Sequence, residues 1–339
     1  MGVVRTHPRV REALAAGKPV VGLETAVLTH GLPREPIETP ECFIAPDALD
    51  AALHQPLVWD PAVPAHLQLS LLMSQAVRDG GAEPAVIAVV DGVLEIGLDE
   101  NAVRDLAARD DATKASTRDL AALATTGGTA GTTVAASLLA CTLASPKPIQ
   151  TLATGGIGGV HRDWQTRPDI SADLKALAKY PVAVVASGAK VILDLIATTE
   201  ALDSLSIPVV GCKTSWFPRF TAGVDERLPL AHRIDEPAAI ARLCQTHWTD
   251  LKASSAVLVA HPCPAELVAD SAALDRLVDL GLAEAAALGI DGGGVTPFLL
   301  GAIGRTPGVP QLSANIALLL SNAAQAARIA TAMSMQPID

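Results

Sequence analysis

The stretch from Thr151 to Leu195 brings together residues that can bind an anion and form a covalent adduct. It holds four glycines within positions 155–159, then His161, a polar segment and Lys190. Glycines let backbone N–H groups approach an anion closely, because no Cβ stands in the way. Lys190 follows a predicted strand, and ligands of open α/β sheets bind beyond the carboxyl ends of strands. A lysine there can be a nucleophile, a phosphate ligand or a solvated surface charge.

Glu24 and Asp169 stand at positions where a carboxylate can have either a structural or a functional role. Glu24 ends an apolar strand predicted over residues 19–23. Partial loss of hydration at that position would raise its pKa towards that of a working general acid, although a capping or salt-bridged Glu fits the same pattern. Asp169 precedes a helix predicted over residues 170–179, which is the usual place of an N-cap.

These residues need elements to position them, and short buried strands alternate with helices along the chain. The strands are predicted over residues 19–23, 84–90, 93–96, 150–153, 182–186, 206–210 and 255–260. The helices are predicted over residues 4–16, 67–79, 99–108, 134–143, 170–179, 191–197, 237–248, 274–288 and 315–333. This alternation favours an α/β fold, an α/β/α sandwich with a mainly parallel central sheet. Asp91-Gly92 predicts a hairpin turn within it.

We expect one domain over residues 1–339, interrupted by an insertion at about residues 34–66. That segment carries six prolines and little periodicity. It could be a lid, an oligomer contact or a passive insertion.

Composition narrows the class of protein. The net charge of −11 argues against non-specific binding to nucleic acid, which needs a basic surface. Five scattered cysteines without a CxxC pair indicate free thiols in a reducing compartment. Apolar runs are broken before 18 residues, so no membrane span is predicted. We therefore expect a cytoplasmic protein without a nucleic-acid or membrane partner.

Ten short motifs indicate a particular protein family. They are GLETAVLTHGLP (22–33), PAVIAVVDGVLEIGL (84–98), KASTRDL (114–120), GTTVAASL (131–138), ATGGIGGVHR (153–162), DISADL (169–174), SGAKVILDL (187–195), TTEALDSLSIPVVG (198–211), TPFLL (296–300) and SANIALLLSNA (313–323). In these motifs and their order the chain resembles the pseudouridine-5′-phosphate glycosidase family, the indigoidine synthase A-like proteins. The resemblance covers nearly the whole chain except residues 34–66.

The resemblance implies an enzyme that cleaves pseudouridine 5′-phosphate to uracil and ribose 5-phosphate. Lys190 falls on a lysine that attacks ribose C1′ and forms a Schiff-base-type adduct, and Glu24 falls on the acid that protonates the ring oxygen. Asp169 falls on the ligand of Mn²⁺ or another divalent cation. The positions implied to bind substrate are Lys114, Val134, Thr154, His161, Ser171, Ala172, Asp173 and Asn315. The resemblance also implies a homotrimer.

The chain departs from the family pattern at several positions. Thr25 and His261 stand where the family usually has Ser and Asn, and Thr129 stands where an Asn is common. Residues 218–230 match poorly. Because the implied lysine, acid and metal ligand are all present, these departures bear on the substrate more than on the reaction. A different C-nucleoside phosphate as substrate, or a non-catalytic sugar-phosphate-binding protein, stays open.

Overall fold

The computed structural model describes residues 2–44, 56–162, 164–166, 168–268, 270–290, 295, 298, 299 and 311–335. Its centre is a ten-stranded sheet. The main path of the sheet runs β1 (Val4–Thr6), β4 (Val93–Ile96), β3 (Glu83–Val90), β2 (Val20–Leu23), β7 (Thr151–Ala153), β8 (Ala183–Ala186), β12 (Val257–Ala260) and β9 (Val209–Gly211). The six strands from β3 to β9 on this path are mutually parallel. β4 pairs antiparallel with β3 across the Asp91-Gly92 turn, as the hairpin pattern predicts.

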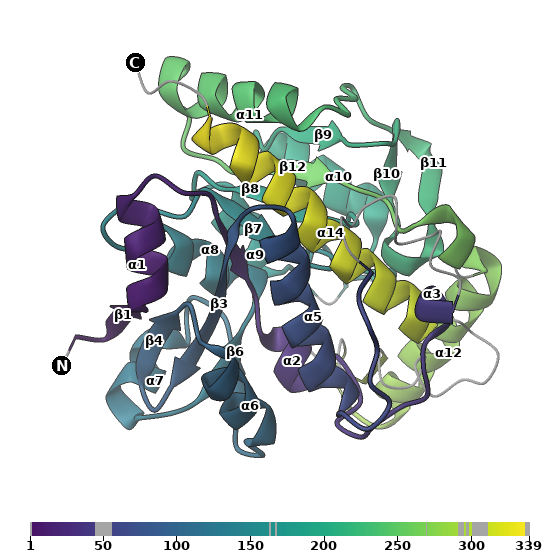
Figure 1. Ribbon diagram of the computed structural model, residues 1–339. Helices are drawn as coiled ribbons and strands as arrows, with labels where there is room; N and C mark the ends of the chain where they lie inside the picture. The colour runs from purple at the N-terminus through teal and green to yellow at the C-terminus, as the bar shows by residue number, and fades with distance from the viewer. Residues whose placement is uncertain are drawn as a thin grey trace.

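Helices cover both faces of the sheet (Figure 1). One face carries α5 (Ala65–Asp79), α11 (Pro237–Gln245) and α14 (Gln311–Ser334). The other carries α1 (Pro8–Ala15), α8 (Val134–Leu143), α9 (Ala172–Leu177) and α10 (Leu195–Ser204). Successive residues of β3 contribute alternately to the two cores, because side chains of a strand point to opposite faces. The predicted three-layer α/β/α sandwich is confirmed.

α14 is the central helix of its layer and lies diagonally across the sheet in Figure 1. The segment Leu312–Ser334 is long and apolar enough to cross a membrane, yet 78% of its most apolar window is buried inside the molecule. It packs against α5, α11 and the strands β2, β7 and β8. Its apolar composition is therefore that of a helix with most of its surface in a core.

Four predicted elements differ from the observed ones, two in kind and two in their bounds. Residues 4–16 do not form one helix, because β1 comes first and α1 begins at Pro8, whose ring suits the first helical turn. Residues 191–194 form a turn instead of a helix, and Asp194 caps α10. The strand predicted over residues 206–210 is β9, which begins at Val209. The helix predicted over residues 170–179 is α9 alone, with Ser171 as its cap.

Some elements of the structure were not predicted from the sequence. The poorly matching segment forms most of a hairpin of β10 (Trp216–Pro218) and β11 (Val224–Pro229). β5 (Thr113–Ala115) and β6 (Ala130–Thr132) pair beside β3.

The two ends of the proline-rich segment lie together. Pro36 and Pro64 form a bridge, and the side chains of Cys42 and Trp59 are buried in the core on the α14 side of the sheet. A short helix, α3 (Glu41–Ile44), contacts α14. Residues 45–55 lie outside the described residues.

Candidate active site

Three neighbouring parallel strands deliver three polar residues to one edge of the sheet. β7 lies between β2 and β8, with Leu23 opposite Ala153 in one pair of strands and Ala153 opposite Val185 in the other. Glu24 and Thr154 directly follow β2 and β7, and Lys190 ends the turn that follows β8. The carboxyl ends of parallel strands meet at one edge, where α/β proteins bind ligands. Strand order thus brings Glu24 and Lys190 together from positions far apart in the sequence.

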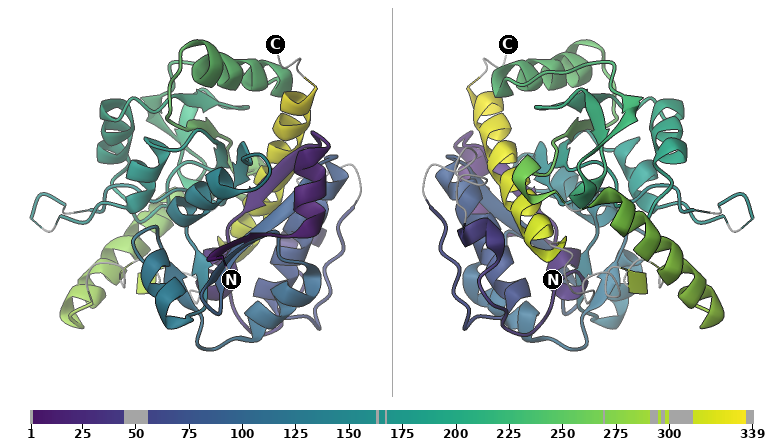
Figure 2. Two further views of the ribbon diagram at one scale, coloured as in Figure 1. Left: turned by 90° about the vertical axis from the view of Figure 1, so that its left-hand side faces the viewer. Right: turned by 90° about the vertical axis from the view of Figure 1, so that its right-hand side faces the viewer.

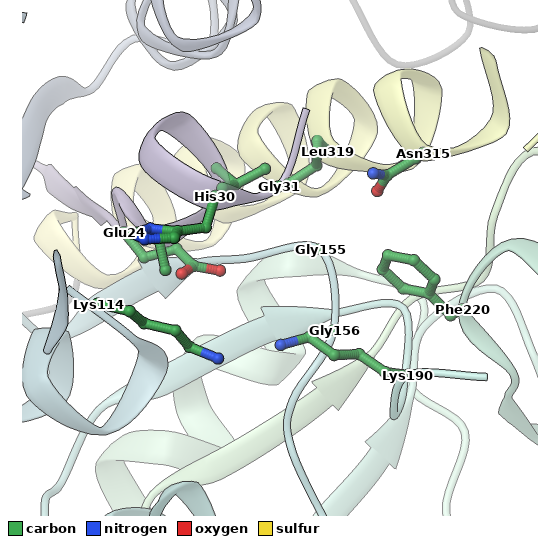
Figure 3. Close-up of a pocket in the computed structure, with 12 residues that line it drawn as sticks. Glu24, His30, Gly31, Lys114, Gly155, Gly156, Lys190, Phe220, Asn315 and Leu319 are labelled. Atoms are coloured by element: carbon green, nitrogen blue, oxygen red, sulfur yellow. The ribbon is translucent and has the colours of Figure 1, made fainter. Parts of the chain in front are cut away.

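A pocket opens at this edge, with a volume of about 580 Å³ when its mouth is included. It is lined by Glu24, Ala26, Val27, His30, Gly31, Lys114, Gly155, Gly156, Lys190, Phe220, Asn315 and Leu319. Figure 3 shows that the ammonium groups of Lys114 and Lys190 point towards each other, with the carboxyl of Glu24 nearby. Four of the residues predicted for the site therefore line one pocket: Glu24, Lys114, Lys190 and Asn315.

Glu24 is held in a way that favours its protonated form. Burial raises the pKa of Glu24, while the charge of Lys190 and a hydrogen bond from Thr154 oppose that rise. Thr154 Oγ1 donates to Glu24 Oε1 at 2.6 Å. Thr25 anchors the same segment, since its hydroxyl donates to Ile87 O at 2.6 Å and accepts from Thr132 N at 3.0 Å. A hydroxyl is needed at position 25, and either Ser or Thr supplies it.

Lys190 ends a tight turn that the neighbouring backbone holds in place. Gly188 has φ +65°, and a Cβ there would lie 1.9 Å from Pro218 O. Phe220 N donates to Ser187 O at 2.9 Å, and Lys190 N donates to Ile157 O at 3.2 Å. The turn is therefore fixed on both sides by main-chain hydrogen bonds.

Lys114 approaches from β5, outside the run of parallel strands. The residue as a whole is partly open to solvent, and its ammonium end lies in the pocket (Figure 3). Loss of hydration lowers the pKa of Lys114, and the positive charge of Lys190 lowers it further. Two facing ammonium groups repel each other unless an anion lies between them, so the pair favours an anionic ligand.

Asp173 and Asn322 hold the glycine-rich turn from two directions. The buried carboxylate of Asp173 accepts from Gly158 N at 2.8 Å and from Ala135 N at 2.9 Å. Asn322 Nδ2 donates to Thr154 O at 2.8 Å. Asp173 therefore organises the turn through the backbone and does not line the pocket. Val134 is buried at the start of α8, next to Ala135.

The DISAD segment lies at the start of α9, beside the pocket. Ser171 caps the helix by accepting from Asp173 N, and Ala172 is exposed. His161 Nδ1 lies 3.8 Å from Asp169 Oδ2. Burial lowers the pKa of His161, Asp169 opposes this, and Lys190 and Lys114 add to it. His161 is thus close enough to feel both pocket lysines, although neither it nor Asp169 is among the lining residues.

A metal site built by the protein alone is not present among the described residues, which contain no group of three His, Cys, Asp or Glu side chains placed to hold an ion. Asp169 offers one carboxylate, 33% exposed. One carboxylate together with waters and substrate oxygens suits a hard cation that keeps part of its hydration shell. The residues present fit an open site of that kind.

Comparison with known proteins of similar sequence and fold shows the family to which the chain belongs. The model of the indigoidine synthase A like protein family matches residues 60–332. A pseudouridine-5′-phosphate glycosidase from Hahella chejuensis is 38% identical over 324 residues, covering 95% of this chain and 96% of the relative. One from Paracoccus denitrificans is 39% identical over 334 residues, covering 98% of this chain and 99% of the relative. The chain belongs to the indigoidine synthase A-like family.

Two solved structures of related proteins have the same fold. The prealnumycin C-glycosynthase AlnA, in complex with ribulose 5-phosphate, matches with a TM-score of 0.81 and 30% identity over 98% of both chains. An indigoidine synthase A-like protein from Thermotoga maritima matches with a TM-score of 0.79 and 28% identity, over 98% of this chain and 97% of that one. The family resemblance, the α/β fold and the membership in an enzyme family are thus confirmed.

Three of the departures from the family pattern, at Thr25, Thr129 and His261, are not among the residues that line the pocket. Thr129 accepts a hydrogen bond from Asp91 N at the hairpin turn. His261 is buried, and its Nδ1 lies 3.0 Å from Asn322 Oδ1. His261 therefore contacts the residue that holds Thr154 and is not itself a pocket residue.

Sequence reasoning missed the pocket residues His30, Phe220 and Leu319. His30 belongs to the THGLP part of the first motif, and that membership was the available signal. Phe220 lies in the segment that matched the family poorly, so no motif indicated a role for it. In Figure 3 its ring stands at one side of the pocket, beyond Lys190.

Proposed function

We propose that this protein is a C-glycosidase that cleaves pseudouridine 5′-phosphate to uracil and ribose 5-phosphate. The observation that carries the proposal is the single pocket shared by Glu24, Lys114 and Lys190. A carboxyl that keeps its proton, an amine and a second cation are the groups needed to open a phosphorylated ribose and hold it.

Lys114 pairs with the anionic substrate, and the amine nitrogen of Lys190 attacks ribose C1′. As the new N–C1′ bond forms, the C1′–O4′ bond breaks and Glu24 transfers its proton to O4′. The secondary ammonium formed on attack returns a proton to the Glu24 carboxylate, which frees the nitrogen lone pair. Glu24 then protonates uracil C5, and the nitrogen lone pair expels uracil as the C1′–C5 bond breaks. Water adds to the resulting imine, releases ribose 5-phosphate and regenerates the amine. A sugar carbon is a poor site for simple acid hydrolysis when its leaving group is carbon, which is why a nitrogen electron source is needed.

We assign Asp169 as the protein ligand of a divalent cation such as Mn²⁺, with His161 beside it. When bound, the cation would orient the substrate's oxygens by Lewis-acid attraction. A homotrimeric, cytoplasmic enzyme is part of the same proposal.

The Lys190→Ala variant tests the central role of the lysine. We expect turnover to fall below detection, because the other amine of the pocket, Lys114, pairs with the anionic substrate, and for the same reason phosphate binding should stay measurable. Borohydride treatment with ribose 5-phosphate should add the reduced sugar phosphate to the parent protein at residue 190, as read by peptide mass spectrometry, and not to the variant.

Full activity in Lys190→Ala would contradict the assignment. Binding of ribose 5-phosphate without a trapped adduct on the parent protein would favour a non-catalytic sugar-phosphate-binding protein.

A second candidate is the same chemistry on a different C-nucleoside phosphate. The structural match to a C-glycosynthase favours it, because that protein bears a different name and has the same fold. Comparing turnover of pseudouridine 5′-phosphate with that of other C-nucleotides separates the two. The first proposal requires pseudouridine 5′-phosphate to have the highest kcat/KM.

A further inference from the structure

The turn that carries Lys190 lies between two arginines from different parts of the chain. Arg162 Nη2 donates to Val191 O at 3.4 Å, directly after the lysine. On the other side, Arg219 and Gly188 form an isolated β-bridge. Arg162 follows His161 in the sequence, and Arg219 precedes Phe220. Each arginine therefore belongs to a loop that supplies a residue at or beside the pocket.

One carboxylate binds both arginines. Asp275 Oδ1 accepts from Arg162 Nη2 at 3.1 Å and from Arg219 Nη2 at 2.9 Å, and its Oδ2 accepts from Arg219 Nη2 at 3.0 Å. Asp275 lies on α12 (Ser271–Ala287), a helix that extends from the body of the molecule in Figure 2. Because both guanidinium groups approach the same oxygen, they are close to each other and repel without the intervening negative charge.

We infer that Asp275 is a positioning residue for Lys190, acting through Arg162 and Arg219. The inference rests on the proposed function, since it assigns a role in placing that function's nucleophile. Arg219 is only 13% exposed at its side chain and Arg162 24% exposed, so water compensates their charges poorly. The clamp formed by Arg162, Asp275 and Arg219 fixes both flanks of the turn, and with them the direction of the Lys190 amine.

Asp279, four residues after Asp275 on α12, provides a matched control. Asp279 Oδ1 accepts from Arg162 Nη1 at 2.7 Å, and its side chain is 69% exposed. An Asp279→Asn change removes the same charge from the same helix but leaves Asp275 bound to both arginines. A general effect of charge or of helix stability would appear in both variants, and an effect that depends on one carboxylate bridging both arginines would appear only in Asp275→Asn.

The test compares Asp275→Asn, Asp279→Asn and the parent protein in steady-state kinetics. A small displacement of a reacting group costs one to two orders of magnitude in rate, so we expect kcat of Asp275→Asn to fall by about tenfold or more. KM should change by less than about threefold, because Lys114 still binds the anion, and Asp279→Asn should stay within about twofold of the parent. Asp275→Glu, which restores the charge, should recover part of kcat.

Hydrogen exchange gives a readout that does not need activity. The amides of Lys190 and Phe220 donate to Ile157 O and Ser187 O and therefore report on the turn. We expect faster exchange at both in Asp275→Asn than in Asp279→Asn, under conditions where both variants are folded by circular dichroism. Equal kcat and equal exchange in the two variants would overturn the inference, as would an effect of Asp275→Asn on KM alone. If the parent protein lacks glycosidase activity, the proposed function fails, and the exchange comparison still decides whether the clamp exists.

Discussion

At the scale of single residues, the chemistry depends on a carboxyl whose environment contains opposing effects. Burial favours the neutral form of Glu24, whereas Lys190 and the hydroxyl of Thr154 favour the carboxylate. The balance leaves the pKa of Glu24 raised, which keeps a proton available for the ring oxygen at higher pH than an exposed Glu would. The Thr154 hydroxyl can be removed without changing the size of the side chain.

The Thr154→Val variant should move the alkaline limb of the kcat profile to higher pH. Its valine cannot donate to Glu24, so the carboxylate loses stabilisation and the pKa of Glu24 rises further. The acid then stays protonated over a wider range of pH. Steady-state rates measured across the pH range check this result.

Thr132→Val is the control for that measurement, because the buried Thr132 hydroxyl donates to Ile87 O at 2.6 Å and not to Glu24. An alkaline limb that stays in place in Thr154→Val, or moves equally in the control, would show that the hydrogen bond does not tune the acid.

At the scale of elements, the turn after β8 decides where the nucleophile lies. A side chain at position 188, now a glycine, would disrupt this turn. Gly188 combines a left-handed φ of +65° with a carbonyl oxygen 1.9 Å from the place of a Cβ. Gly127 has a similar φ of +71°, at the end of α7 (Leu120–Thr126), but nothing lies within 4 Å of its Cβ position. Comparing variants at Gly188 and Gly127 therefore separates the cost of a left-handed backbone from the cost of a steric clash.

Gly188→Ala should lower the free energy of unfolding by clearly more than Gly127→Ala, which pays only the left-handed cost of about 1 kcal/mol. The alanine at 188 must displace the 216–218 strand, so activity should also fall by about tenfold or more. Urea denaturation and kinetics measure the two effects. Equal destabilisation in the two variants would mean that the close approach to Pro218 is easily relieved.

At the scale of the whole molecule, α14 links the residue that follows β7 to the residue that follows β12, at the edge of the sheet where the parallel strands end. Its Asn322 bonds to the glycine-rich turn and to His261, which follows β12. Because Asn322 Nδ2 donates to Thr154 O, its Oδ1 accepts, and His261 Nδ1 is the donor. Burial lowers the pKa of His261 to about 4, so the imidazole is neutral at pH 7.

This neutral histidine makes stability depend on pH. The unfolded chain takes up a proton at His261 below its ordinary value of 6.5, whereas the folded protein resists protonation until about 4. The free energy of unfolding should therefore fall as the pH drops from 6.5 towards 4, with His261 contributing about 3 kcal/mol. His261→Asn, which does not titrate, should show a flatter dependence in denaturation at several pH values. An unchanged slope would contradict the role given to His261.

Local patterns in the sequence were enough to predict the α/β class, the hairpin at Asp91-Gly92 and the family, because strand and helix periodicity and short motifs are properties of neighbouring residues. It also singled out Glu24, Lys114, Lys190 and Asn315, which do share a pocket. Three features could be seen only in the folded molecule: Asp173 binds backbone amides, Phe220 lines the pocket and Asp275 binds both arginines. These contacts join residues far apart in sequence, and they exist only because of the order of strands in the sheet and the packing of helices on it.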